Sequence, residues 1–96
     1  EAEALALLEN DIQTHMVELI HAGIGFGAMN VARQNALIDM HFNLGHTRFM
    51  QFRNMIAALA AEDFEVAADE MLDSRWARQV GQRAETLARQ IRTGER

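Results

Sequence analysis

The placement of glycine and the absence of proline constrain the fold of this chain more than any other feature. All six glycines lie near the ends of apolar, helix-like segments or in the short loop Gly23–Gly27. Both residue types interrupt helices, whereas Ala, Leu, Met, Glu, Gln and Arg, which dominate between the glycines, favour them. The sequence therefore predicts an all-α fold, a compact orthogonal bundle of five to six short helices in a single domain over residues 1–96.

Apolar residues recur at three- and four-residue steps, which is typical of helices with one buried face. Thr47, Asp63 and Ser74 precede three such segments and are predicted to cap them at their N-termini. The predicted segments are residues 1–21, 30–44, 48–60 and 64–72, a short turn through residue 76, and residues 82–92.

Composition excludes several classes of function. Cysteine is absent, so there is no disulfide and no thiolate metal site, and the apolar runs are far shorter than the ~20 residues that cross a bilayer.

The net charge is −5, although residues 71–96 hold six of the nine arginines. A helical nucleic-acid binder is therefore an alternative, but the acidic balance and the lack of a second basic helix argue against it. We expect no membrane partner and no nucleic-acid partner.

Three groups of residues could carry chemistry by themselves, and each has a simpler structural explanation. The glycines of Gly23–Gly27 lack the preceding strand and the following Lys-Ser/Thr of a phosphate-binding loop, which favours a connector. The carboxylates between Glu62 and Asp73 cluster on one short helix and its approach instead of flanking a cleft, so a solvated acidic face is favoured. Ser74 is the only serine and is best explained as a cap.

Histidine offers the remaining possibility of a metal site. His41 and His46, with Asp39 nearby, could form a site with two histidines and one carboxylate. They are five residues apart across Gly45, however, whereas metal-binding helices use histidines four residues apart on one face. The spacing therefore predicts no metal site and no cofactor.

Two short motifs carry a resemblance to a known family. They are Phe42-Asn43-x-Gly45 and the run Ser74-Arg75-Trp76, followed by Arg83 and by Arg92-Thr93-Gly94. With them, the sequence from residue 33 to residue 94 resembles the phage-type lysozymes, also called endolysins or muramidases, and residues 1–12 resemble them more weakly. The part that is matched is the C-terminal helical lobe of that family.

The resemblance implies a role in cleaving the β-1,4 bond between N-acetylmuramic acid and N-acetylglucosamine in peptidoglycan. In such enzymes an N-terminal segment carries the general-acid glutamate, and the helical lobe forms the opposite wall of the cleft. The resemblance implies that Phe42 and Asn43 bind substrate, that Arg83 supports the glutamate, and that Trp76 and Arg75 are structural anchors. Packing of Phe42 and Trp76 in the core, and a bridge from Arg75 to a carboxylate, are the structural alternatives.

The family's glutamate-led motif, followed by a glycine-rich hairpin containing threonine, does not occur in these 96 residues. We therefore expect no catalytic residue here and no hydrolysis by this chain alone, as for a lobe truncated from a complete glycosidase. A non-catalytic structural or binding module of a phage or prophage is the alternative. The expected partners are peptidoglycan, the N-terminal lobe of the same protein and, through exposed apolar surface, a second copy. The expected location is the bacterial host cytoplasm, with action on the periplasmic wall after release.

Overall fold

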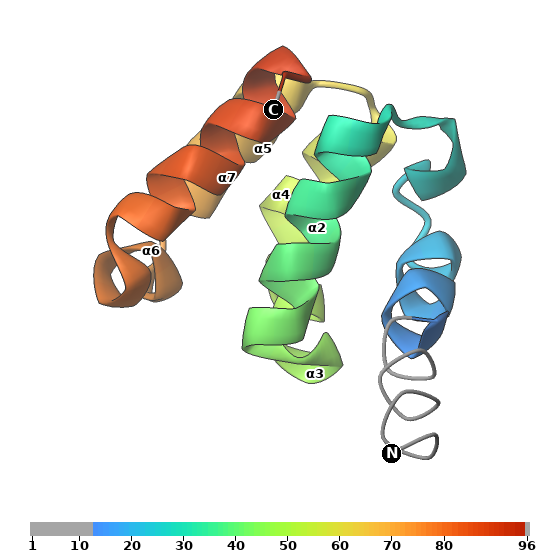
Figure 1. Ribbon diagram of the computed structural model, residues 1–96, viewed down its shortest axis with the longest axis horizontal. Helices are drawn as coiled ribbons and strands as arrows, with labels where there is room; N and C mark the ends of the chain where they lie inside the picture. The colour runs from blue at the N-terminus through green and yellow to red at the C-terminus, as the bar shows by residue number, and fades with distance from the viewer. Residues whose placement is uncertain (1–12, 96) are drawn as a thin grey trace, which may run out of the picture.

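A computed structural model describes residues 13–95, and every regular element among them is helical. A first helix occupies residues 13–21, and two later helices, α5 (Phe64–Leu72) and α7 (Gln82–Thr93), lie side by side (Figure 1). The remaining elements are η1 (Phe26–Ala28), α2 (Val31–Leu44), α3 (His46–Met50), α4 (Arg53–Ala60), α5 (Phe64–Leu72), α6 (Arg75–Val80) and α7 (Gln82–Thr93). The predicted all-α class is confirmed, and residues 1–12 of the helix predicted over residues 1–21 lie outside the described residues.

A single apolar core joins these helices. The largest side chains that are fully buried include Phe49 and Met71, and α2 contributes Leu37, Met40 and His41, the one buried polar side chain among residues 13–95. α7 packs against α2, α5 and α6, and α2 packs against α3 and α7. No helix among residues 13–95 is both long and apolar enough to cross a membrane.

Two of the three predicted caps are confirmed by hydrogen bonds. The Asp63 side chain accepts a hydrogen bond from the Val66 amide at 3.3 Å, and the Ser74 hydroxyl accepts one from the Ala77 amide at 3.1 Å. These bonds satisfy amide groups that the first turn of a helix leaves unpaired. The helix that follows Ser74 is longer than predicted and continues to Val80.

The predicted cap at Thr47 and the continuous helix over residues 48–60 are wrong. α3 begins at His46, directly after Gly45, and ends at Met50, and α4 begins only at Arg53. Phe52 interrupts the helix because its ψ angle of 63° is far from the helical value. The break reorients the chain so that Phe49 is fully buried while Phe52 packs against the core from its edge.

The caps give a direct test of this account. Ser74→Ala should lower the free energy of unfolding by about 1 kcal/mol, as is typical for loss of an N-cap. Thr47→Ala is the matched control, because this exposed hydroxyl caps no helix, and it should change stability by less than about 0.5 kcal/mol. Urea denaturation of both variants measures the difference, and equal effects would contradict the assignment.

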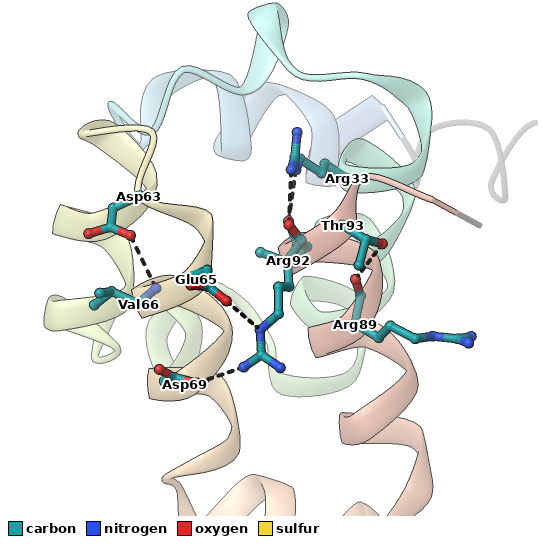
Figure 2. A network of polar contacts seen from close by, with 9 residues as sticks. Arg33, Asp63, Glu65, Val66, Asp69, Arg89, Arg92 and Thr93 are labelled. Atoms are coloured by element: carbon teal, nitrogen blue, oxygen red, sulfur yellow. Dashed lines mark hydrogen bonds and ion pairs between the residues drawn. The ribbon is translucent and has the colours of Figure 1, made fainter.

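The C-terminus of α7 is fixed to the N-terminus of α2. Arg33 donates from Nε to the carbonyl oxygen of Ile91 at 2.7 Å and from Nη2 to that of Arg92 at 3.2 Å (Figure 2). Asn30 Nδ2 donates to the carbonyl oxygen of Gly94 at 2.8 Å. These carbonyl groups have no partner within α7, so the side chains of α2 replace the missing helical bonds.

Gly94 allows this close approach. Its φ angle is 72°, and a Cβ atom there would come within 2.8 Å of Asn30 Nδ2. Only glycine adopts this backbone conformation without strain and without a clash.

Carboxylates of α5 hold the other side of α7. Arg92 Nη2 donates to Asp69 Oδ1 at 2.6 Å, and Arg92 Nε lies 3.8 Å from Glu65 Oε1 (Figure 2). Both carboxylates are largely exposed, as expected for a solvated acidic face. Part of the acidic cluster therefore has a structural role in the packing of α5 against α7.

Candidate functional site

A groove of about 690 Å³ lies between α6 on one side and α3 and α4 on the other. Its apolar lining consists of Leu44, Phe52, Met55 and Trp76, and its charged lining consists of Arg48, Arg53, Glu70, Asp73 and Arg75. An apolar floor with charged groups around it suits a ligand that has both apolar faces and polar substituents. Of the five site residues that the family resemblance implies, Trp76 and Arg75 line this groove.

Trp76 joins the groove to the core. Its side chain is only 5% exposed, and its ring meets that of Phe52 edge to face, with centroids 6.5 Å apart and planes at 83°. The structure therefore places Trp76 in the core, as the structural alternative for this residue has it. Its indole Nε1 donates to Asn43 Oδ1 at 3.4 Å.

The bond from Trp76 fixes the orientation of the Asn43 amide. Because an indole N–H can only donate, the oxygen of Asn43 must face Trp76 and the nitrogen must face away. Asn43 is exposed, and within residues 13–95 its NH₂ group makes no hydrogen bond. Two donors are thus available to a ligand at the end of α2, beside the groove.

Arg83, on α7, pairs with Asp39, which lies one helical turn before Asn43 on α2. Its Nη2 and Nε both donate to Asp39 Oδ1, at 2.5 and 3.1 Å. Asp39 and Asn43 are four residues apart on α2 and so share one face of that helix. The structure therefore brings Arg83 and Asn43 to the same side of α2, although neither lines the groove itself.

Phe42 lies apart from these residues. Its side chain is 62% exposed, and its ring centroid is 5.2 Å from that of His15, on the first described helix. The alternative of a core position is therefore wrong for Phe42. An exposed aromatic ring could bind the apolar face of a sugar. Phe42 would do so from outside the groove, because it is not part of the groove's lining.

No pattern in the sequence singles out Arg48 and Arg53, which line the groove from either side of the break between α3 and α4. Asp39 was predicted only as a possible metal ligand, whereas in the structure its carboxylate pairs with Arg83. Residue spacing describes one helix at a time, so it predicts neither the arginines that line the groove nor the pairing of Asp39 with Arg83.

Three histidines, His15, His41 and His46, form a second polar cluster beside Phe42. His41 Nε2 lies 3.0 Å from His46 Nδ1, and His41 Nδ1 lies 2.5 Å from His15 Nδ1. Burial lowers the pKa of His41, and the nearby His15 and His46 lower it too, whereas the Glu18 carboxylate acts in the opposite direction. The cluster thus holds a neutral imidazole at its centre near pH 7.

Comparison with known proteins gives two further findings. The sequence model of the phage lysozyme family matches residues 1–94. The pre-baseplate central spike protein Gp5 of Enterobacteria phage T4 is 34% identical over 95 residues. That alignment covers 96% of this chain and 16% of the spike protein, so the chain is similar to one short segment of a much longer protein.

Proposed function

Because this chain belongs to the phage lysozyme family, we propose that it is the substrate-binding lobe of a domain that cleaves peptidoglycan between N-acetylmuramic acid and N-acetylglucosamine. The observation that carries the proposal is the Asn43 amide, which Trp76 orients so that its NH₂ group faces away from the core. Peptidoglycan offers acceptors in its N-acetyl carbonyl groups and sugar hydroxyls, and an oriented amide is suited to them.

The charged lining of the groove supports the same substrate. The peptide stems of peptidoglycan carry carboxylates, and arginine is the side chain that binds carboxylates best, through paired hydrogen bonds. Arg48, Arg53 and Arg75 supply such groups around Trp76. The ligand we propose therefore has its sugars near Asn43 and Phe42 and its peptide stem in the groove.

Bond cleavage requires a proton donor, and no carboxylate of the groove is placed to act as one. Glycosidases place two carboxyl groups on opposite sides of the scissile bond, whereas Glu70 and Asp73, the carboxylates of the groove, come from one helix and its end. In our proposal the donor is a glutamate outside residues 1–96. Arg83, which Asp39 holds half exposed, would be the group that orients it.

A binding assay with purified peptidoglycan tests this proposal. The 96-residue chain should sediment with peptidoglycan and release no reducing ends from it. Asn43→Ala should weaken binding about fivefold, as expected for one hydrogen bond of ~1 kcal/mol. Release of reducing ends by the wild-type chain would contradict the division between the two lobes, and unaltered binding by Asn43→Ala would contradict the assignment of the site.

A second function, a lysozyme-derived module built into a phage particle, is favoured by the similarity to the T4 spike protein. The two functions differ in where the protein is found. A free endolysin acts from the host cytoplasm after release, whereas a spike module co-purifies with virions. Probing purified virions with an antibody against this chain distinguishes them.

Pairing through apolar surface remains a proposal. Val17 and Ile20, on the first described helix, are 50% and 53% exposed. This surface suits either the N-terminal lobe or a second copy of the chain. Sedimentation at increasing concentration would detect the second copy.

A further inference from the structure

Four side chains of the kinds that bind metal ions converge where the first described helix packs beside the end of α2. His15 and Glu18 come from the first helix, His41 is on α2, and His46 is the first residue of α3. His41 is completely buried, whereas the side chains of His46 and Glu18 are 42% and 33% exposed. The cluster is thus closed on one side and open to solvent on the other.

The separations within the cluster are those of ligands around one ion. His41 Nε2 lies 3.0 Å from His46 Nδ1 and 4.0 Å from Glu18 Oε1, and His46 Nδ1 lies 3.5 Å from Glu18 Oε2. Two nitrogens bound tetrahedrally to zinc at ~2.0–2.1 Å are roughly 3.4 Å apart. The three side chains therefore lie close enough together for one ion to be placed among them.

His15 determines which nitrogen of His41 is free to bind. The 2.5 Å contact joins His41 Nδ1 to His15 Nδ1, so one of these two atoms carries the shared proton. When His41 donates it, Nε2 keeps its lone pair and faces His46 and Glu18. Histidines that bind metals commonly donate their other ring N–H in this way, which fixes the tautomer and the orientation of the ring.

We propose that Glu18, His41 and His46 bind one divalent transition-metal ion of the zinc class, with His15 positioning His41. Three protein ligands leave a fourth position for water on the open side, between Glu18 and His46. Phe49 and Phe42 form the apolar surroundings, since the Phe49 ring lies 5.1 Å from that of His41 and the Phe42 ring lies 5.2 Å from that of His15.

Such an ion would fasten the first described helix to α2 and α3. His15, Glu18 and His41 can also bring one ligand atom each within 4.8 Å of one another, which is the competing ligand set. The sequence predicted no metal site at His41, His46 and Asp39. Residue spacing does not show that the first helix, with His15 and Glu18, lies beside His41 and His46. Asp39 pairs with Arg83 and takes no part.

Titration of the 96-residue chain with ZnCl₂ by isothermal calorimetry tests the proposal. We expect one ion per chain, and we expect Glu18→Gln and His46→Ala to weaken binding by more than the 10–100-fold that loss of a supporting residue costs. His15→Ala should weaken it by about that 10–100-fold. His21→Ala is the matched control, because this exposed histidine is on the same helix and outside the cluster, and it should bind as the wild type does.

Thermal denaturation with zinc or with EDTA separates loss of metal binding from loss of folding. Zinc at about 100 times Kd should raise the Tm of the wild type and of His21→Ala by on the order of 10 °C, and should leave that of His46→Ala almost unchanged. The site would be overturned if the wild type did not bind one ion, or if His21→Ala lost as much zinc affinity as His46→Ala. Wild-type affinity in His46→Ala would overturn our choice of ligands in favour of His15.

Discussion

Trp76→Ala should lower the free energy of unfolding by about 3–5 kcal/mol, as expected when a large buried aromatic side chain is removed and leaves a cavity. Trp76 is almost fully buried, packs against Phe52 and bonds to Asn43, so its loss affects both the core and the wall of the groove. Urea denaturation followed by circular dichroism measures this change without relying on tryptophan fluorescence.

Trp76→Phe separates packing from hydrogen bonding. It keeps an aromatic ring against Phe52 but removes the N–H that orients Asn43, so the loss should be smaller, about 1–2 kcal/mol. Asn43 should then lose its fixed orientation, and peptidoglycan binding should fall with it. A loss below about 1 kcal/mol in Trp76→Ala would contradict the role of this residue as an anchor.

Arg33→Ala should produce the second largest loss, about 2–4 kcal/mol. The substitution removes two hydrogen bonds from a charged group, each worth about 1.5–3 kcal/mol before the structure relaxes. It also removes a cation from the C-terminus of α7 and the guanidinium that lies 3.8 Å from the centre of the Phe64 ring. Urea denaturation again provides the measurement.

Two other arginine substitutions control for charge. Arg33→Lys keeps the charge but not the paired donors or the flat stacking surface, so it should recover less than half of the loss. Arg89→Ala removes an exposed arginine whose side chain points away from the network in Figure 2, and it should cost less than about 0.5 kcal/mol. Equal destabilisation of Arg89→Ala and Arg33→Ala would contradict our claim that the hydrogen bonds from Arg33 to α7 stabilise the fold.

Local chemistry explains which parts of the fold could be predicted from the sequence. The caps Asp63 and Ser74 and the end of α7 at Gly94 depend on residues within a few positions of one another, so the sequence is enough to locate them. The break at Phe52 does not depend on such a local signal. It depends on how Phe49 and Phe52 are both accommodated by the core, which only the tertiary packing decides.

The sequence indicated some residues of the candidate site but none of their contacts. Family resemblance indicated Asn43, Trp76 and Arg83, yet Asn43 bonds to a residue 33 positions away and Arg83 to one 44 positions away. Periodicity along a helix contains no information about such partners. The histidine cluster is the same case, because His15 is 26 positions from His41 and belongs to another helix.

A titration of the ¹⁵N-labelled chain with a soluble peptidoglycan fragment, a disaccharide that carries its peptide stem, tests the central claim most directly. We expect the largest NMR shift changes at the Asn43 side-chain amide and the Trp76 indole N–H, with smaller ones at the Arg48 and Arg75 side chains, and no cleavage of the fragment. If saturating fragment shifts resonances only on other faces of the molecule, or shifts none, the helical lobe does not bind peptidoglycan through this surface.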